Sequence, residues 1–255
     1  MQDEQLRKEV NNALDRAERI WKRVEPKLVM MSESLIIKAG IEDSLPSNIP
    51  GYPQVNPTEP EVDDFIAFVL DIRNSSKHLT EAIGGTAKVS QLKRVLYEIT
   101  AINTIGSIIT DEKQGKITEF LGDGFLALYR VSKNDKQNVY KAHDAAKECI
   151  RVTNTIVNSI LSDRYKLPPL KIGIGMAYSQ AIITTMGYGN NLHPKALGEC
   201  VFRATKLSDG TNEILIDDRL KHFWPSSKNG NLQFNLKNNS HGFNGYTITY
   251  ATQRH

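Results

Sequence analysis

Apolar residues recur along much of the chain at the three- to four-residue spacing of amphipathic helices. Over residues 4–39 they alternate with Lys, Arg and Glu, which predicts a helix kinked or interrupted at Pro26. The same spacing predicts helices over 86–110, 136–163 and about 197–208. The amphipathic pattern of the N-terminal helix is equally typical of packing on its own domain and of a dimer contact, so both remain open.

Shorter apolar runs between these helices predict strands. Residues 64–70 form one strand, and 116–121 and 125–130 flank Gly122-Asp123-Gly124 as a hairpin. A second hairpin is predicted over 170–178 and 181–186. Further short strands are predicted near 214–216, 233–236 and 246–251. This order of elements predicts an α/β (α+β) sandwich around a mostly antiparallel central sheet, with the N-terminal helix added.

Residues 40–60 interrupt both periodicities. The segment carries Gly51 and four prolines: Pro46, Pro50, Pro53 and Pro57. Such a composition predicts an extended connector. We therefore divide the chain into an N-terminal helical segment (1–40), a Pro-rich linker (41–60) and a catalytic domain (61–255).

Composition narrows the class of protein. No apolar run in the 255 residues approaches the ~20 that a membrane span requires, and residues 1–10 carry no signal-peptide stretch. The 32 basic and 29 acidic residues give a net charge of +3, too mild to indicate nucleic-acid binding. Two cysteines make neither a disulfide framework nor a metal-binding spacing. We expect a soluble cytoplasmic protein that binds neither membrane nor nucleic acid.

Two aspartates stand out by their placement. Asp71 ends an apolar strand that leads into a helix which residues 74–76 could cap, and Asp123 lies at the tip of a hairpin between two glycines. Each alone is typical of a surface turn residue. Together they place two carboxylates at strand ends, where they could converge on hard divalent cations.

Four segments carry a resemblance to a known family. Residues 68–76 (FVLDIRNSS) resemble the motif F-x-D-I-x-G-F-T, and residues 120–129 (FLGDGFLALY) resemble I-G-D-x-x-x-A-x-F. Residues 170–177 (LKIGIGMA) match R-I-G-I-G-I-x-x-G, and 197–207 (LGECVFRATKL) resemble G-D-x-V-N-x-A-x-R-L. With these motifs in this order, the chain resembles the class III nucleotidyl cyclases.

The resemblance implies a ferredoxin-like catalytic domain that forms a head-to-tail homodimer with active sites at the interface. It implies that Asp71, Asp123 and the Ile72 carbonyl hold two Mg²⁺ or Mn²⁺ ions during attack of the ribose 3′-hydroxyl on the α-phosphate. It also implies that backbone amides bind the β- and γ-phosphates. Those amides belong to Ile72, Arg73, Asn74, Ser75 and Ser76.

Several positions depart from the family pattern. Glu119 stands where adenylate cyclases have a base-reading Lys, and Lys195 stands where they have its Asp partner, so the charges are reversed. Phe202 replaces the Asn that orients the ribose. Lys206 replaces the transition-state Arg and would act as a point charge, with Arg203 as the alternative cation.

These departures, with the overall layout, resemble the pyrimidine cyclases of Pycsar antiphage systems, whose product activates a separate effector. That resemblance implies cyclic UMP or cyclic CMP as product, and the residues at the base-reading positions favour UTP as substrate. Glu119 suits the N3–H of uracil and Lys195 suits its O4 or O2. CTP and GTP remain alternative substrates. A catalytically weak nucleotide-binding regulatory domain is the alternative of another class, favoured by Phe202 and Lys206.

Overall fold

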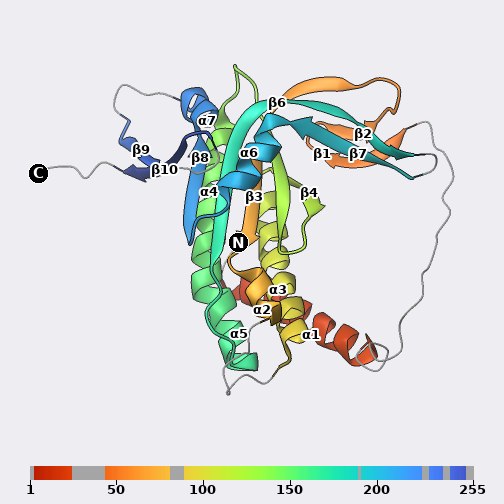
Figure 1. The fold of residues 1–255 in the computed structure, drawn as a ribbon, viewed down its shortest axis with the longest axis vertical. Coiled ribbons are helices and arrows are strands. Elements are labelled where there is room, and N and C mark those ends of the chain that lie inside the picture. The colour runs from red at the N-terminus through yellow and green to blue at the C-terminus, as the bar shows by residue number, and fades with distance from the viewer. Residues whose placement is uncertain are drawn as a thin grey trace, which may run out of the picture.

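A computed structural model shows a central sheet with helices on both faces (Figure 1). It describes residues 3–24, 44–80, 89–188, 191–225, 230–237 and 242–250. The helices are α1 (Asp3–Val24), α2 (Ser75–Thr80), α3 (Gln91–Glu112), α4 (Gln137–Val152), the π-helical turn η1 (Thr153–Val157), α5 (Asn158–Tyr165), α6 (Glu199–Leu207) and α7 (Asp218–Phe223). The strands are β1 (Leu45–Ile49), β2 (Tyr52–Val55), β3 (Glu61–Ile72), β4 (Lys116–Phe120), β5 (Gly124–Arg130), β6 (Ile172–Tyr188), β7 (Asn191–Gly198), β8 (Glu213–Asp217), β9 (Leu232–Lys237) and β10 (Gly245–Tyr250).

The main sheet has the strand order β4-β5-β3-β6-β8-β10-β9, and β7 pairs with β6 outside this path. Neighbouring strands run antiparallel except β6 and β8, which are parallel. The predicted mostly antiparallel α+β sandwich is therefore confirmed. Among the helices that the structure describes, none combines the length and the apolar character needed to cross a membrane.

Strand β3 is covered on both faces, which explains its unbroken apolar run. Ile66, Phe68 and Leu70 point into a core formed with α1, α3, α4 and α5. Phe65 and Ala67 point to the opposite face, where α6 and the β1–β2 hairpin cover them. In Figure 1, α6 lies on one side of the sheet, and α3 and α4 lie on the other. This burial on both faces fixes the register in which β3 delivers Asp71.

Helix α1 belongs to the core of its own domain. Leu6, Val10 and Leu14 are fully buried against the domain, where α1 contacts α3 and η1. Arg164 of α5 donates to the Asp15 and Glu18 carboxylates of α1 at 2.6 and 2.7 Å. The apolar face of the helix is thus covered within one chain. Of the two roles that the sequence left open, packing on its own domain is confirmed. Residues 25–39, which the sequence pattern also predicted as helix, lie outside the described residues.

The segment predicted as an extended connector contains a β-hairpin. Strands β1 and β2 pair antiparallel, with Pro46 opposite Gln54. Ile49 and Val55 are buried against the main sheet. Proline lacks an N–H donor and is confined to edge or irregular pairings, which this two-stranded unit provides. The hairpin therefore packs on the domain as part of it, and in Figure 1 it lies beside β7.

The second predicted hairpin is wrong. Residues 172–188 form the single strand β6, and its hairpin partner is β7. The Ser179-Gln180 pair looks like a turn, but it continues the ladder opposite Phe65 and Asp64 of β3. Because Ser179 is buried and its hydroxyl accepts the Cys200 amide at 2.9 Å, tertiary contacts hold this polar pair in a strand. The other predicted strands and helices match the observed elements within a few residues.

Candidate active site

Asp71 and Asp123 come together at one end of the sheet. Asp71 lies opposite Gly124 in the β3–β5 ladder, and the Ile72 amide donates to the Asp123 carbonyl at 2.9 Å. A Cβ added at Gly124 would lie 1.8 Å from the Leu70 carbonyl oxygen, so only glycine permits this close approach. The hairpin is thereby held directly against β3, with Asp123 beside Asp71.

The closeness of the two carboxylates changes the acidity of Asp71. Burial, followed by the negative charge of Asp123, raises the pKa of Asp71 to about 7. The Arg73 guanidinium opposes this shift and only partly offsets it. Two like charges in a partly buried site indicate that a cation or a proton is needed there.

Two side chains from the β3–α2 turn contact these carboxylates. Arg73 Nη1 donates to Asp71 Oδ2 at 2.8 Å and to the Ser208 carbonyl at 3.2 Å. Ser75 Oγ donates to Asp123 Oδ2 at 2.6 Å. Sequence reasoning used only the backbone of these two residues and missed their side chains, since no local pattern signals a contact between β3 and a hairpin 48 residues later. The turn thus orients both acids.

The same turn contains one residue in the left-handed backbone region. Asn74 has φ of +59°, in the left-handed region where the motif has glycine, and Asn is among the residues that tolerate it. Its carbonyl accepts the amides of Lys77 and His78 as α2 begins. The Arg73 amide donates to the Lys171 carbonyl at 2.9 Å. The Ile72 and Arg73 amides, which were predicted to bind phosphate, thus already donate to backbone carbonyls, whereas no backbone acceptor among the described residues takes the amides of Asn74, Ser75 and Ser76.

The donor chemistry at Asp71 and Asp123 fits a hard divalent cation. Both offer carboxylate oxygens, which Mg²⁺ and Mn²⁺ prefer, and a cation would relieve their mutual repulsion. The residues that the structure describes hold no cluster of three or more His, Cys, Asp or Glu side chains arranged for a metal. These two aspartates are therefore the candidate metal ligands, with backbone oxygens or substrate completing the shell.

Glu119 of β4 and Lys195 of β7 form a direct ion pair. Lys195 Nζ lies 2.9 Å from Glu119 Oε1, and both side chains are about one-third exposed. The two residues thus meet in space although they are 76 residues apart in the sequence. Their charges are reversed relative to the pattern of adenylate cyclases. The pair leaves one carboxylate oxygen and two ammonium N–H donors for a ligand.

Helix α6 presents two of the remaining predicted residues to solvent. Phe202 is 57% exposed, and Lys206 Nζ lies 5.9 Å from the centre of its ring. Arg203 instead pairs with Glu199 of its own helix and with Asp217 of β8 and Asp218 of α7. Of the two cations that the sequence offers on α6, Lys206 alone remains available to a substrate.

Solved structures share this fold at low sequence identity. No protein-family model matches the sequence, and neither does any curated protein. The crystal structure of the guanylyl cyclase Cya2 is similar at a TM-score of 0.60 and 14% identity, over 76% of this chain and 96% of that one. The adenylyl cyclase CyaB from P. aeruginosa gives 0.60 and 16% identity, over 76% and 98%. The chain has the fold of a class III cyclase catalytic domain.

A guanylate cyclase domain from Catenaria anguillulae, solved in complex with GTP, shares this cyclase fold at a TM-score of 0.57 and 15% identity. It is covered over its full length by 75% of the present chain.

Glycine within residues 172–175 allows a helix to pack closely on strand β6. A Cβ at Gly175 would lie 2.0 Å from the Ala204 carbonyl oxygen, so glycine lets α6 pack directly on β6.

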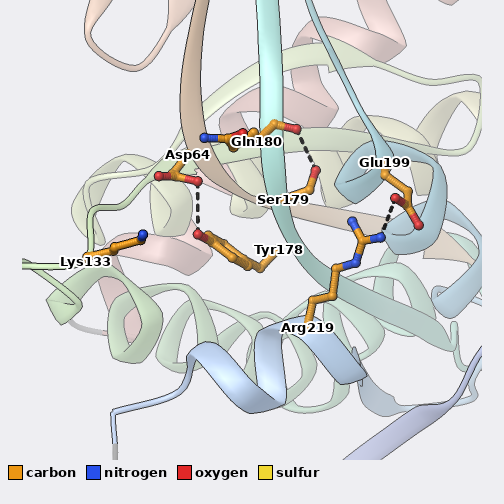
Figure 2. A pocket seen from close by; sticks show the side chains of 7 residues that line it. All are labelled: Asp64, Lys133, Tyr178, Ser179, Gln180, Glu199 and Arg219. Carbon is orange, nitrogen blue, oxygen red and sulfur yellow. Dashed lines mark hydrogen bonds and ion pairs between the residues drawn. The ribbon is translucent and has the colours of Figure 1, made fainter.

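A polar cleft of about 480 Å³ lies at the opposite end of β3 in this cyclase fold (Figure 2). Its lining residues are Asp64, Lys133, Tyr178, Ser179, Gln180, Glu199 and Arg219. In Figure 2 the Tyr178 hydroxyl points to Asp64, at 2.9 Å, and Arg219 points to Glu199, at 2.7 Å. The cleft contains none of the sequence-predicted site residues, and both of its carboxylates already have partners.

Proposed function

We propose that this protein is a nucleotidyl cyclase that converts UTP to 3′,5′-cyclic UMP and pyrophosphate. The observation that carries the proposal is the convergence of Asp71 and Asp123 at the paired ends of β3 and the β4–β5 hairpin. Similar structures include adenylyl and guanylyl cyclases, one of them in complex with GTP. A concentrated negative charge on this fold is suited to a cation-bound triphosphate.

In the proposed reaction, the ribose 3′-hydroxyl releases its proton to solvent water, and its oxygen forms a bond to the α-phosphorus. The bond from that phosphorus to the oxygen that bridges to the β-phosphate breaks, and pyrophosphate leaves. Two divalent cations, held by Asp71, Asp123 and the Ile72 carbonyl, would neutralise the triphosphate and lower the pKa of the 3′-hydroxyl. Amides of the turn at residues 74–76 would hold the outer phosphates, and Arg73 would add positive charge beside them.

The base preference is proposed from the Glu119–Lys195 pair. With one oxygen free, Glu119 can accept the N3–H of uracil, and the remaining N–H donors of Lys195 can reach a carbonyl oxygen. Cytosine can offer its N4 amino group to Glu119 instead, so CTP is the nearest competitor. Guanine can offer its N1–H and amino group, which keeps GTP as a third candidate.

A complete site requires a second copy of the chain in this proposal. The large apolar side chains exposed on β4, β6, β7 and α6 are Phe120, Ile182, Met186, Leu197 and Phe202. In this proposal these side chains belong to the surface that contacts the second copy. We place Asp71 and Asp123 of one copy opposite Glu119, Lys195 and Lys206 of the other, in a homodimer with two shared sites.

The biological setting is proposed from the resemblance to pyrimidine cyclases of antiphage defence. Cyclic UMP would act as a second messenger in the cytoplasm and would be read by a separate effector protein. The alternative of another class is a weakly active nucleotide-binding regulatory domain, which the exposed Phe202 at the ribose-orienting position favours. Retention of both acidic residues at the metal position favours the enzyme.

Incubation of the purified full chain with each of the four ribonucleoside triphosphates and Mn²⁺ tests the proposal. We expect release of pyrophosphate together with a cyclic nucleotide, fastest with UTP, and no release from the Asp123→Ala variant. A chain that binds UTP and Mn²⁺ but releases no pyrophosphate from any triphosphate would favour the regulatory domain.

A further inference from the structure

A cavity of about 250 Å³ lies beside the Glu119–Lys195 pair, where β1 bridges β4 and β7. Its walls come from residues 46–49 of β1, Thr118 of β4 and residues 193–195 of β7. Lys195 therefore belongs both to the ion pair and to the cavity. No motif places β1 here, because the sequence pattern of residues 41–60 predicts only a connector.

The β1 wall is firmly attached. Ile49 and Val55 are 4% and 3% exposed and pack on the main sheet. The Tyr52 hydroxyl donates to Asp63 Oδ2 at 2.9 Å, and the Arg130 guanidinium lies over the Tyr52 ring. Because the hairpin is anchored at both strands, the cavity is preformed, which lowers the entropic cost of binding a ligand there.

Two polar residues of β1, Ser47 and Asn48, are among the residues that line this cavity, as is Lys195. Ser47 Oγ accepts the Ile49 amide at 2.9 Å, which stiffens the turn of chain around Asn48. Asn48 is exposed, and its carboxamide forms no hydrogen bond with another described residue, so it is accessible to a ligand in the cavity. A carboxamide offers a donor and an acceptor side by side, the arrangement that pairs with the adjacent carbonyl and N–H groups of a uracil edge.

We propose that the β1–β2 hairpin forms a further wall of the base subsite and that Asn48 reads the base edge together with Glu119 and Lys195. The inference rests on the proposed function and deepens it, since it assigns base selectivity partly to a segment outside the four cyclase-like motifs. A volume of about 250 Å³, below the ~300–1,000 Å³ of pockets for larger ligands, suits a single small ring system.

The test uses nucleotides that bind without reacting. 3′-Deoxy-UTP and 3′-deoxy-CTP lack the attacking hydroxyl, so calorimetric titration with Mn²⁺ present measures binding apart from turnover. We expect Asn48→Ala to weaken binding of the preferred probe by about tenfold and to reduce the ratio between the two affinities by a similar factor, as for the loss of one hydrogen bond. Gln54→Ala is the matched control on the neighbouring strand, because Gln54 is exposed and its side chain accepts a hydrogen bond from Ser44, away from the cavity lining.

The outcomes separate this inference from the proposed function. Unchanged affinities in Asn48→Ala, with altered affinities in Glu119→Ala, would overturn the hairpin wall and leave the cyclase proposal standing. A wild-type chain that cyclises no triphosphate would overturn the cyclase proposal, while the binding ratios would still decide the role of Asn48. Failure of the wild-type chain to bind either probe would overturn both. Thermal melts of each variant confirm folding.

Discussion

The two ends of strand β3 both carry aspartates, but these are compensated in different ways. At the first end, Asp63 accepts the Tyr52 hydroxyl and pairs with Arg130, and Asp64 accepts the Tyr178 hydroxyl at 2.9 Å. Burial and the Asp64 charge raise the pKa of Tyr178 to about 12, so it remains a protonated donor. These carboxylates have the partners that a structural role requires.

At the second end, Asp71 lies beside another carboxylate. Arg73 and Ser75 contact the acids, but the pKa of Asp71 is still raised to about 7. Unrelieved like charge costs stability, and such sites are typical of ligand binding or catalysis. The comparison shows that aspartates on one strand are paired with hydrogen-bond and ion-pair partners at one end, whereas at the other end two carboxylates lie together, where the proposed function places a cation-associated substrate.

Removal of a carboxylate at the second end should have the largest effect. We expect Asp71→Ala or Asp123→Ala to lower the cyclisation rate by at least about 10³-fold, because each removes an oxygen ligand from a charge-dependent site. The matched control at the first end, Asp64→Ala, should keep its activity and lose about 1 kcal/mol of stability through its unpaired Tyr178 hydroxyl. Product formation and thermal melts are the measurements. Near wild-type turnover in Asp71→Ala or Asp123→Ala would contradict the assignment of these aspartates to the active site.

Mixing two inactive chains should restore part of the activity. An Asp123→Ala chain and a Lys206→Ala chain would leave one intact shared site in each heterodimer. Random pairing at equal amounts makes half of the dimers heterodimers, so we expect about a quarter of wild-type activity. Light scattering must show dimers in the mixture. Dimers that form without any recovery of activity would contradict the shared site.

Removal of Glu119 tests the Glu119–Lys195 ion pair, whose charges balance each other and which we propose to recognise the base. We expect Glu119→Ala to reduce discrimination between UTP and CTP by about tenfold, with a smaller effect on turnover of the preferred triphosphate. The control Asp111→Ala breaks an exposed ion pair with Lys116 of the same strand, β4, and should leave selectivity unchanged. Ratios of kcat/KM measure both. Equal effects of the two variants would make Glu119 a structural residue.

The smallest expected effect is on stability. Because the native pKa of Asp71 is raised from 3.8 to about 7, the folded chain binds more protons than the unfolded chain between these values. Stability contributed by this residue is therefore lost as pH rises from about 4 to 7. Asp71→Asn should remove this loss and melt ~2–4 °C above wild type at pH 8, about 1 kcal/mol after allowance for solvent exposure.

Melts of Asp71→Asn and wild type in EDTA from pH 4 to 8 measure that difference. At pH 4 the two proteins should melt together, since both are uncharged at this position. A difference that is constant over the whole range would show that the substitution acts through packing and that the raised pKa of Asp71 does not contribute.

Sequence patterns predicted the central elements of the fold because those elements are buried and regular. The apolar run of β3 and the Gly-Asp-Gly turn correctly predicted the strand and the hairpin, and the structure brings Asp71 and Asp123 at their ends close together. The patterns failed where edge strands contain proline. Pro46 in β1 and Pro194 in β7 argue locally against strands, yet both strands are at edges, where the missing N–H costs little.

In the candidate site too, sequence patterns predicted some residues and missed contacts that depend on the tertiary fold. Asp71, Asp123, Glu119 and Lys195 were predicted from the sequence and the resemblance that it carries, and the structure brings each pair together. The contacts of the Arg73 and Ser75 side chains and the position of Asn48 depend on elements far apart in sequence. No local spacing encodes such contacts, so they emerge only with the tertiary fold.

The most direct test of the central claim is a competition between the four ribonucleoside triphosphates, at equal concentrations with Mn²⁺, with products identified by mass spectrometry. The account predicts chiefly cyclic UMP, with cyclic CMP as the main secondary product, because Glu119 and Lys195 leave one acceptor and two donors for a pyrimidine edge. Predominantly cyclic AMP would contradict the base assignment, and the absence of any cyclic nucleotide would contradict the assignment of the protein as a cyclase.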